Sequence, residues 1–206
     1  MTDDLASARA DLAFLRDLAE GDPRPKASLG LLLMAGGLFY GLETLIHWLG
    51  TSGLVGVPDW VHFAAAIFGT GGFLTVVVLV LVATRHEKNS AVTRRAYEAA
   101  FQATGLANLS MVCVFAYNAV RTGDFTIWLY YVPVVFALQG AAWFVAASLR
   151  RQLWYGAVAI GWFLGAVALG MSVDQPARFN LMASLSLIFL MALPGFVMWR
   201  LTLRAR

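Results

Sequence analysis

Residues 28–50 read SLGLLLMAGGLFYGLETLIHWLG, an apolar stretch with one acidic side chain, Glu43, and no lysine or arginine. An α-helix rises ~1.5 Å per residue, so roughly 20 apolar residues cross the ~30 Å hydrocarbon core of a bilayer. Five similar stretches follow, and the predicted spans are about 28–50, 61–83, 97–119, 125–148, 152–173 and 179–201. The sequence therefore predicts an all-α fold, a polytopic membrane bundle of six transmembrane helices with an N-terminal amphipathic cytoplasmic helix.

The composition points to the same class of protein. Apolar residues make up 60% of the chain and charged residues only 13%, whereas soluble domains have roughly 25% charged residues. The connections between the spans are too short to hold a second folded domain. We expect two parts, a cytoplasmic helix and linker over residues 1–27 and a transmembrane domain over residues 28–206.

The basic residues predict the orientation, because basic loops resist translocation and stay in the cytoplasm. Of the 15 lysines and arginines, 13 fall on one predicted side and only Arg121 and Arg178 on the other. The 13 are Arg9, Arg16, Arg24, Lys26, Arg85, Lys88, Arg94, Arg95, Arg150, Arg151, Arg200, Arg204 and Arg206. We expect an integral protein of a bacterial inner membrane with both termini in the cytoplasm.

The amphipathic helix is predicted over residues 3–20, from Thr2 as N-cap to Gly21 as the stop signal. Its apolar face repeats at helical spacing and gives the candidate partner-binding residues Leu5, Leu12, Leu15 and Leu18. Six acids against two arginines give residues 1–22 a net side-chain charge of −4, which disfavours binding to an anionic leaflet. A cytoplasmic protein, a second copy of the chain and the basic loop at residues 85–95 are the alternative partners, and a disordered segment without a partner is the remaining alternative.

Ionisable residues gather near the first predicted turn. Glu43 and His47 lie one helical turn apart, and Asp59 and His62 share a face at the start of the second span. An antiparallel hairpin would bring His47, Asp59 and His62 to similar depth, with Glu43 one turn deeper. The four could then act as ligands for a metal such as zinc or as a proton relay. The alternatives are a structural Glu43–His47 pair and, because Asp59 follows Pro58, a role for Asp59 as a helix-start residue.

Uncharged polar side chains concentrate in the third and fourth spans. Asn108, Asn118 and Gln139 are candidates to line a pathway for a polar solute together with Glu43. The alternative is that these amides hydrogen-bond neighbouring helices together.

Two prolines interrupt predicted spans. Pro133 and Pro194 lack an amide donor and free the carbonyls near Leu129 and Leu190, so kinks are expected and neighbouring side chains or water must satisfy those carbonyls. Small residues four apart predict close helix packing in the first and fifth spans, at Gly37, Gly41, Gly161 and Gly165.

Two function classes remain. All three histidines lie in the first half of the chain and no metalloprotease or nucleophile-elbow motif is present, which argues against an enzyme. The basic patches are explained by membrane topology, so nucleic acid is not an expected partner. No particular cofactor is indicated. We expect a regulatory or assembly protein that engages a cytoplasmic partner or a second copy; the alternative is a small transporter or channel for a polar solute, proton or metal ion.

Overall fold

The computed structural model describes residues 11–12, 27–86 and 92–203, which are helical with short connections and contain no strand. The elements are α2 (Ala27–Thr51), α3 (Asp59–Thr84), α4 (Val92–Thr122), the 3-10 helix η1 (Phe125–Tyr130), α5 (Tyr131–Arg150), α6 (Leu153–Gly170), α7 (Pro176–Leu187), the π-helix η2 (Ile188–Ala192) and α8 (Leu193–Leu203). This part of the chain forms six helices long and apolar enough to cross a membrane, with η1–α5 and α7–η2–α8 each counted as one. The predicted spans are confirmed to within a few residues.

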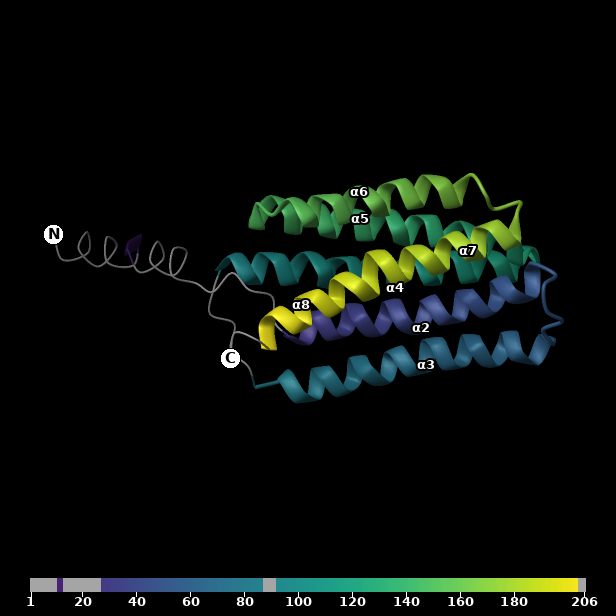
Figure 1. Cartoon of the computed structure of the whole chain (residues 1–206), viewed down its shortest axis with the longest axis horizontal. Helices are drawn as coiled ribbons and strands as arrows, with labels where there is room; N and C mark the ends of the chain where they lie inside the picture. Colours follow the sequence, from purple (N-terminus) through teal and green to yellow (C-terminus); the bar gives the residue numbers. More distant parts are fainter. Residues whose placement is uncertain (1–10, 13–26, 87–91, 204–206) are drawn as a thin grey trace.

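The helices lie roughly antiparallel in a bundle (Figure 1). Helix α2 packs against α3, α7, η2 and α8, whereas α5 packs against α4 and α6, and α6 meets α7. The α2–α3 and α6–α7 connections lie at one end, here called the turn end (Figure 1). The opposite end, where α8 finishes at Leu203, is called the terminal end.

Aromatic side chains fill the core between α5 and α6. Trp143 and Trp162 are fully covered, and Phe136 and Tyr155 are 1% exposed. Phe136 meets the Trp162 ring edge-on, with centroids 4.7 Å apart, an arrangement that aromatic quadrupoles favour. This core fixes α5 against α6, the helix that also meets α7.

Glycines allow α2 to approach the last span closely. A Cβ built at Gly30 would lie 2.6 Å from the backbone nitrogen of Trp199, and one at Gly37 would collide with the backbone of Ala192. Beside Gly41, the buried Ser184 hydroxyl donates to the Gly41 carbonyl at 2.8 Å. The prediction of close packing is confirmed for the first span, because a Cβ at Gly30 or Gly37 would collide with the backbone of the last span.

The two prolines have different outcomes. Pro194 follows the π-helix η2, and the indole Nε1 of Trp162 donates to the Leu190 carbonyl at 3.1 Å. A neighbouring side chain therefore satisfies the carbonyl that Pro194 frees, as predicted. Pro133 is instead the third residue of α5, after the 3-10 helix η1. There the chain changes from a 3-10 helix to an α-helix and places the proline in the first turn of α5, where its missing N–H removes no α-helical hydrogen bond. The kink expected at Pro133 stays a prediction.

The predicted amphipathic helix over residues 3–20 lies outside the described residues, apart from Asp11 and Leu12. Those two are helical and exposed. The first complete helix of the structure, α2, is apolar. The candidate partner-binding residues Leu5, Leu15 and Leu18 also lie outside the described residues.

Candidate functional site

The site lies on the seam between α2 and α3, towards the turn end. Ring contacts set the antiparallel register: Phe39 meets Phe68 with centroids 5.4 Å apart, and Tyr40 meets Phe73 at 5.3 Å. With helices running in opposite directions, this register brings the face of α2 that carries Glu43 onto α3. The predicted convergence across the hairpin is therefore present for part of the cluster.

His47 and His62 form the centre of the site. Their Nδ1 atoms are 2.9 Å apart, their ring centroids are 5.0 Å apart and the ring planes differ by 6°. Rings stacked face to face keep their atoms about 3.5 Å apart, so the two imidazoles lie edge to edge in nearly one plane. This is the geometry of an N–H···N hydrogen bond, in which one Nδ1 carries the proton and the other accepts it.

Glu43 continues this pair deeper into the membrane-spanning region. Its Oε1 lies 3.9 Å from Nε2 of His47, one turn away on α2, which is beyond a direct hydrogen bond. Its Oε2 is buried and has no hydrogen-bond partner among the described residues. The carboxyl group is thus placed next to the histidine pair with one oxygen unsatisfied.

Two glycines make room for these side chains. A Cβ at Gly69 of α3 would collide with the Glu43 carboxyl, and a Cβ at Gly50 of α2 would collide with the His62 ring. Each helix therefore presents a gap that receives a side chain of the candidate site from the other helix. The sequence analysis did not identify Gly50 as part of the site. The only feature that could have pointed to it is its position opposite His62 across the α2–α3 turn.

Asp59 does not join the cluster. It is the first residue of α3, exposed, and follows Pro58 as the helix-start interpretation predicts. Among the described residues, no group of three or more His, Cys, Asp or Glu side chains is arranged to hold a metal ion. The structure places Glu43, His47 and His62 in a row. It does not bring Asp59 to them to form the four-ligand metal site suggested by the sequence.

The amides separate into two kinds. Asn118 donates from Nδ2 to the Val114 carbonyl of its own helix at 2.8 Å. Asn108 Oδ1 and Gln139 Oε1 are buried without a hydrogen-bond partner among the described residues. They belong to α4 and α5, whereas Glu43 belongs to the α2–α3 seam.

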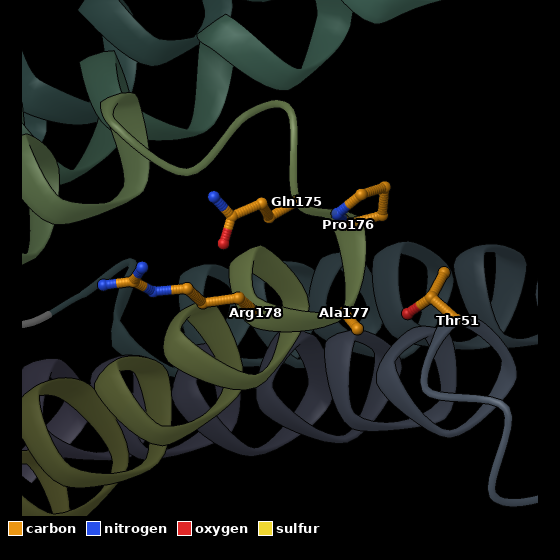
Figure 2. A pocket seen from close by; sticks show the side chains of 5 residues that line it. All are labelled: Thr51, Gln175, Pro176, Ala177 and Arg178. Atoms are coloured by element: carbon orange, nitrogen blue, oxygen red, sulfur yellow. The ribbon is translucent and has the colours of Figure 1, made fainter.

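A shallow pocket of about 420 Å³ opens at the turn end, lined by Thr51, Gln175, Pro176, Ala177 and Arg178. The Gln175 and Arg178 side chains extend in the same direction, and Thr51 lies on the opposite side (Figure 2). The Thr51 hydroxyl donates to the His47 carbonyl at 2.9 Å. The pocket therefore lies one helical turn from the histidine pair.

No protein-family model, no curated protein and no solved structure matches the chain. Its function is therefore argued from the chemistry of the site alone.

Proposed function

We propose that the protein is a non-enzymatic membrane transporter or channel that carries protons along His62, His47 and Glu43. The observation that supports this is the edge-to-edge histidine pair, with Nδ1 atoms 2.9 Å apart, next to the Glu43 carboxyl. Imidazole is the side chain that gains and loses protons most readily near neutral pH. A carboxyl group at membrane depth marks ion and proton pathways more often than it serves packing.

The proton moves from His62 to Glu43 in three steps. A proton binds Nε2 of His62, and His62 passes the proton on its Nδ1 to Nδ1 of His47. His47 then releases the proton on its Nε2 to the Glu43 carboxylate, so one proton moves inward and both imidazoles end neutral, with the Nδ1 proton now on His47. For the next proton, both rings return to their starting tautomers and Glu43 releases its proton towards the terminal end. The 3.9 Å gap between Nε2 of His47 and Oε1 of Glu43 is closed by a rotation of the glutamate or by one bridging water.

The orientation gives the path its direction. The positive-inside distribution, 13 of 15 basic residues on one side, favours a cytoplasmic terminal end and an extracytoplasmic turn end in a bacterial inner membrane. The path would then begin at the outer surface, beside the Thr51 pocket, and reach the Glu43 carboxyl inside the bundle. Extracytoplasmic protons would be its source.

Proteoliposomes that enclose a pH-sensitive dye test the proposal. A potassium diffusion potential should drive proton entry with the wild-type protein, and Glu43→Gln or His62→Gln should lower the initial rate at least tenfold. Asp59→Asn is the matched control. Asp59 is an exposed acid on α3, the helix of His62, and is not part of the row formed by His62, His47 and Glu43. This variant should keep the wild-type rate. Equal rates in wild type, Glu43→Gln and empty liposomes would exclude proton conduction.

A regulatory or assembly role is the second candidate. The observation that favours it is Leu12, a helical residue whose side chain is 66% exposed, on the stripe with Leu5, Leu15 and Leu18. We propose that this stripe would engage a cytoplasmic protein or a second copy of the chain, with lipid around the bundle and no nucleic acid bound. Replacing Leu12 and Leu15 with Asp should abolish crosslinking to that partner and leave membrane insertion unchanged; unchanged crosslinking would count against docking.

A further inference from the structure

The pocket at the turn end joins three separate parts of the chain. Thr51 is the last residue of α2, Gln175 ends the α6–α7 connection and Arg178 lies in the first turn of α7. Pro176 and Ala177 add apolar carbon atoms to the wall. The volume of about 420 Å³ falls among those of small-ligand sites, which span roughly 300–1,000 Å³. The pocket therefore has room for a group of several heavy atoms.

Arg178 brings a positive charge to this pocket, and no side chain of the described residues neutralises it. Arg178 is exposed and forms no ion pair or hydrogen bond with any residue that the structure describes. The nearest acid along the chain is Asp174, which is also exposed and forms no ion pair with Arg178. The Thr51 hydroxyl already donates to the His47 carbonyl. The guanidinium is thus the charged group that the pocket offers to a ligand.

The start of α7 adds to the positive potential. Backbone dipoles place positive charge at the N-terminal end of a helix, which stabilises anions there and disfavours cations. The N-cap residue Gln175 makes no side-chain hydrogen bond to this end. The first α-helical bond runs from the Phe179 N–H to the Gln175 carbonyl at 2.9 Å, so the N–H groups of Ala177 and Arg178 have no α-helical partner. Arg178 therefore lies where a cation is disfavoured unless an anion binds beside it.

Membrane topology does not explain Arg178 either. The positive-inside rule accounts for 13 of the 15 basic residues and leaves Arg121 and Arg178 on the opposite side. Arg121 lies in the last turn of α4, where the negative end of the helix stabilises a cation. Arg178 has no such compensation from its own helix. A cavity, an unpaired guanidinium and an uncapped helix end at one place together indicate an anionic ligand.

We propose that the turn-end pocket binds one phosphate group through Arg178. The guanidinium presents two parallel N–H groups that match two phosphate oxygens, and the first N–H groups of α7 suit a further oxygen. The Gln175 and Arg178 side chains extend in the same direction (Figure 2). The Gln175 amide therefore lies on the side of the pocket where the guanidinium binds the ligand.

The position of the pocket gives two sources for the phosphate. Helix α2 has 25 residues and is about 38 Å long, longer than the ~30 Å hydrocarbon core, so its end at the pocket reaches the lipid headgroups. A phospholipid headgroup and free phosphate in the adjoining water present the same oxygens. Either ligand binds independently of proton conduction along His62, His47 and Glu43.

Two measurements on the full-length protein distinguish these sources. Isothermal titration calorimetry with inorganic phosphate, on protein in an uncharged detergent, detects the free anion as saturable binding. Native mass spectrometry from nanodiscs of phosphatidylcholine and phosphatidylglycerol detects a headgroup as a retained phosphatidylglycerol molecule. We expect at least one of the two signals. A wild-type protein that neither binds phosphate nor retains phosphatidylglycerol overturns the proposal.

Variants then link the binding to Arg178. Arg178→Gln should weaken it roughly tenfold or more, because a bidentate, charge-assisted hydrogen bond is lost. Arg178→Lys should cause a smaller loss, since an ammonium group keeps the charge without the planar fork. Arg121→Gln is the matched control: it removes the other exposed basic residue on the same predicted side and should leave the binding unchanged. Equal losses in Arg178→Gln and Arg121→Gln would show a general effect of charge and overturn the proposal.

Discussion

At the level of single residues, the tightest constraint on the site is the contact between Gly69 and the Glu43 carboxyl. A Cβ at Gly69 would collide with this group, whereas a Cβ at Gly71 of the same helix would meet nothing within 4 Å. Gly69→Ala should displace the carboxyl from His47 and slow proton entry, while Gly71→Ala should not. The dye-loaded proteoliposomes measure both rates, and equal rates would show that the gap is not needed.

Asp124, just before η1, gives a prediction outside the spans. The Thr126 hydroxyl and the Thr126 backbone N–H both donate to the Asp124 carboxylate, at 2.6 and 2.9 Å, and hold its pKa below the usual value. The stabilisation from this cap is present above the ordinary aspartate pKa and is lost as the pH falls through the lowered one. Thr126→Val should raise the pKa of Asp124, as followed by carboxyl ¹³C NMR with Asp124→Asn for assignment. A midpoint unchanged by Thr126→Val would contradict the hydroxyl's role.

The residues of the site were only partly predictable. Spacing and the short turn place Glu43, His47 and His62 together, because those rules depend on helix periodicity alone. They do not fix the position of the Asp59 side chain. A carboxylate at the start of a helix is stabilised there whether it stays exposed or joins a cluster. The gaps at Gly50 and Gly69 required the interhelical register, which rests on aromatic contacts such as Phe39–Phe68.

At the level of elements, the contact that supports the π-helix η2 is the bond from Trp162 to the Leu190 carbonyl. Trp162→Phe should destabilise the protein by about 1–3 kcal/mol, because a buried carbonyl loses its donor. Trp154→Phe is the comparison, since that indole donates to the exposed Gln152 side chain. Unfolding in mixed detergent micelles measures both. Equal losses in the two variants would show that the Leu190 bond contributes little.

Sequence rules for proline specify that a carbonyl is freed and leave open what satisfies it. At Pro194 the donor comes from Trp162, 28 residues before the Leu190 carbonyl, so no local pattern could name it. At Pro133 the apolar run does not reveal the change from a 3-10 helix to an α-helix, because hydropathy gives the polarity of a segment and not its number of residues per turn.

At the level of the whole molecule, contacts within residues 27–203 already join all six spans into one bundle. Removing residues 1–22 should therefore leave the fold and the proton rate unchanged and remove only a partner held by Leu12 and its stripe. Native mass spectrometry in nanodiscs and the dye assay measure the two effects together. A truncated protein that unfolds would place this segment in the bundle instead.

Hydropathy predicted the number and bounds of the spans, because the thickness of the bilayer sets the length of each apolar stretch and polar residues separate one stretch from the next. It did not predict which spans are neighbours, since lipid-facing and helix-facing surfaces are equally apolar. The pairing of α2 with α7 and α8 depends on the shape of the seam at Gly30 and Gly37.

That pairing has a consequence for biosynthesis. The ribosome delivers α2 before α7 and α8, so the glycine surface of α2 that packs against them lacks these neighbours until the spans in between have entered the bilayer. The α2–α3 hairpin is therefore surrounded by lipid while four more spans insert. A chain that stops before α7 would lack the helices that cover the glycine surface of α2. We expect quality-control proteases to degrade such a chain more readily than the full-length protein.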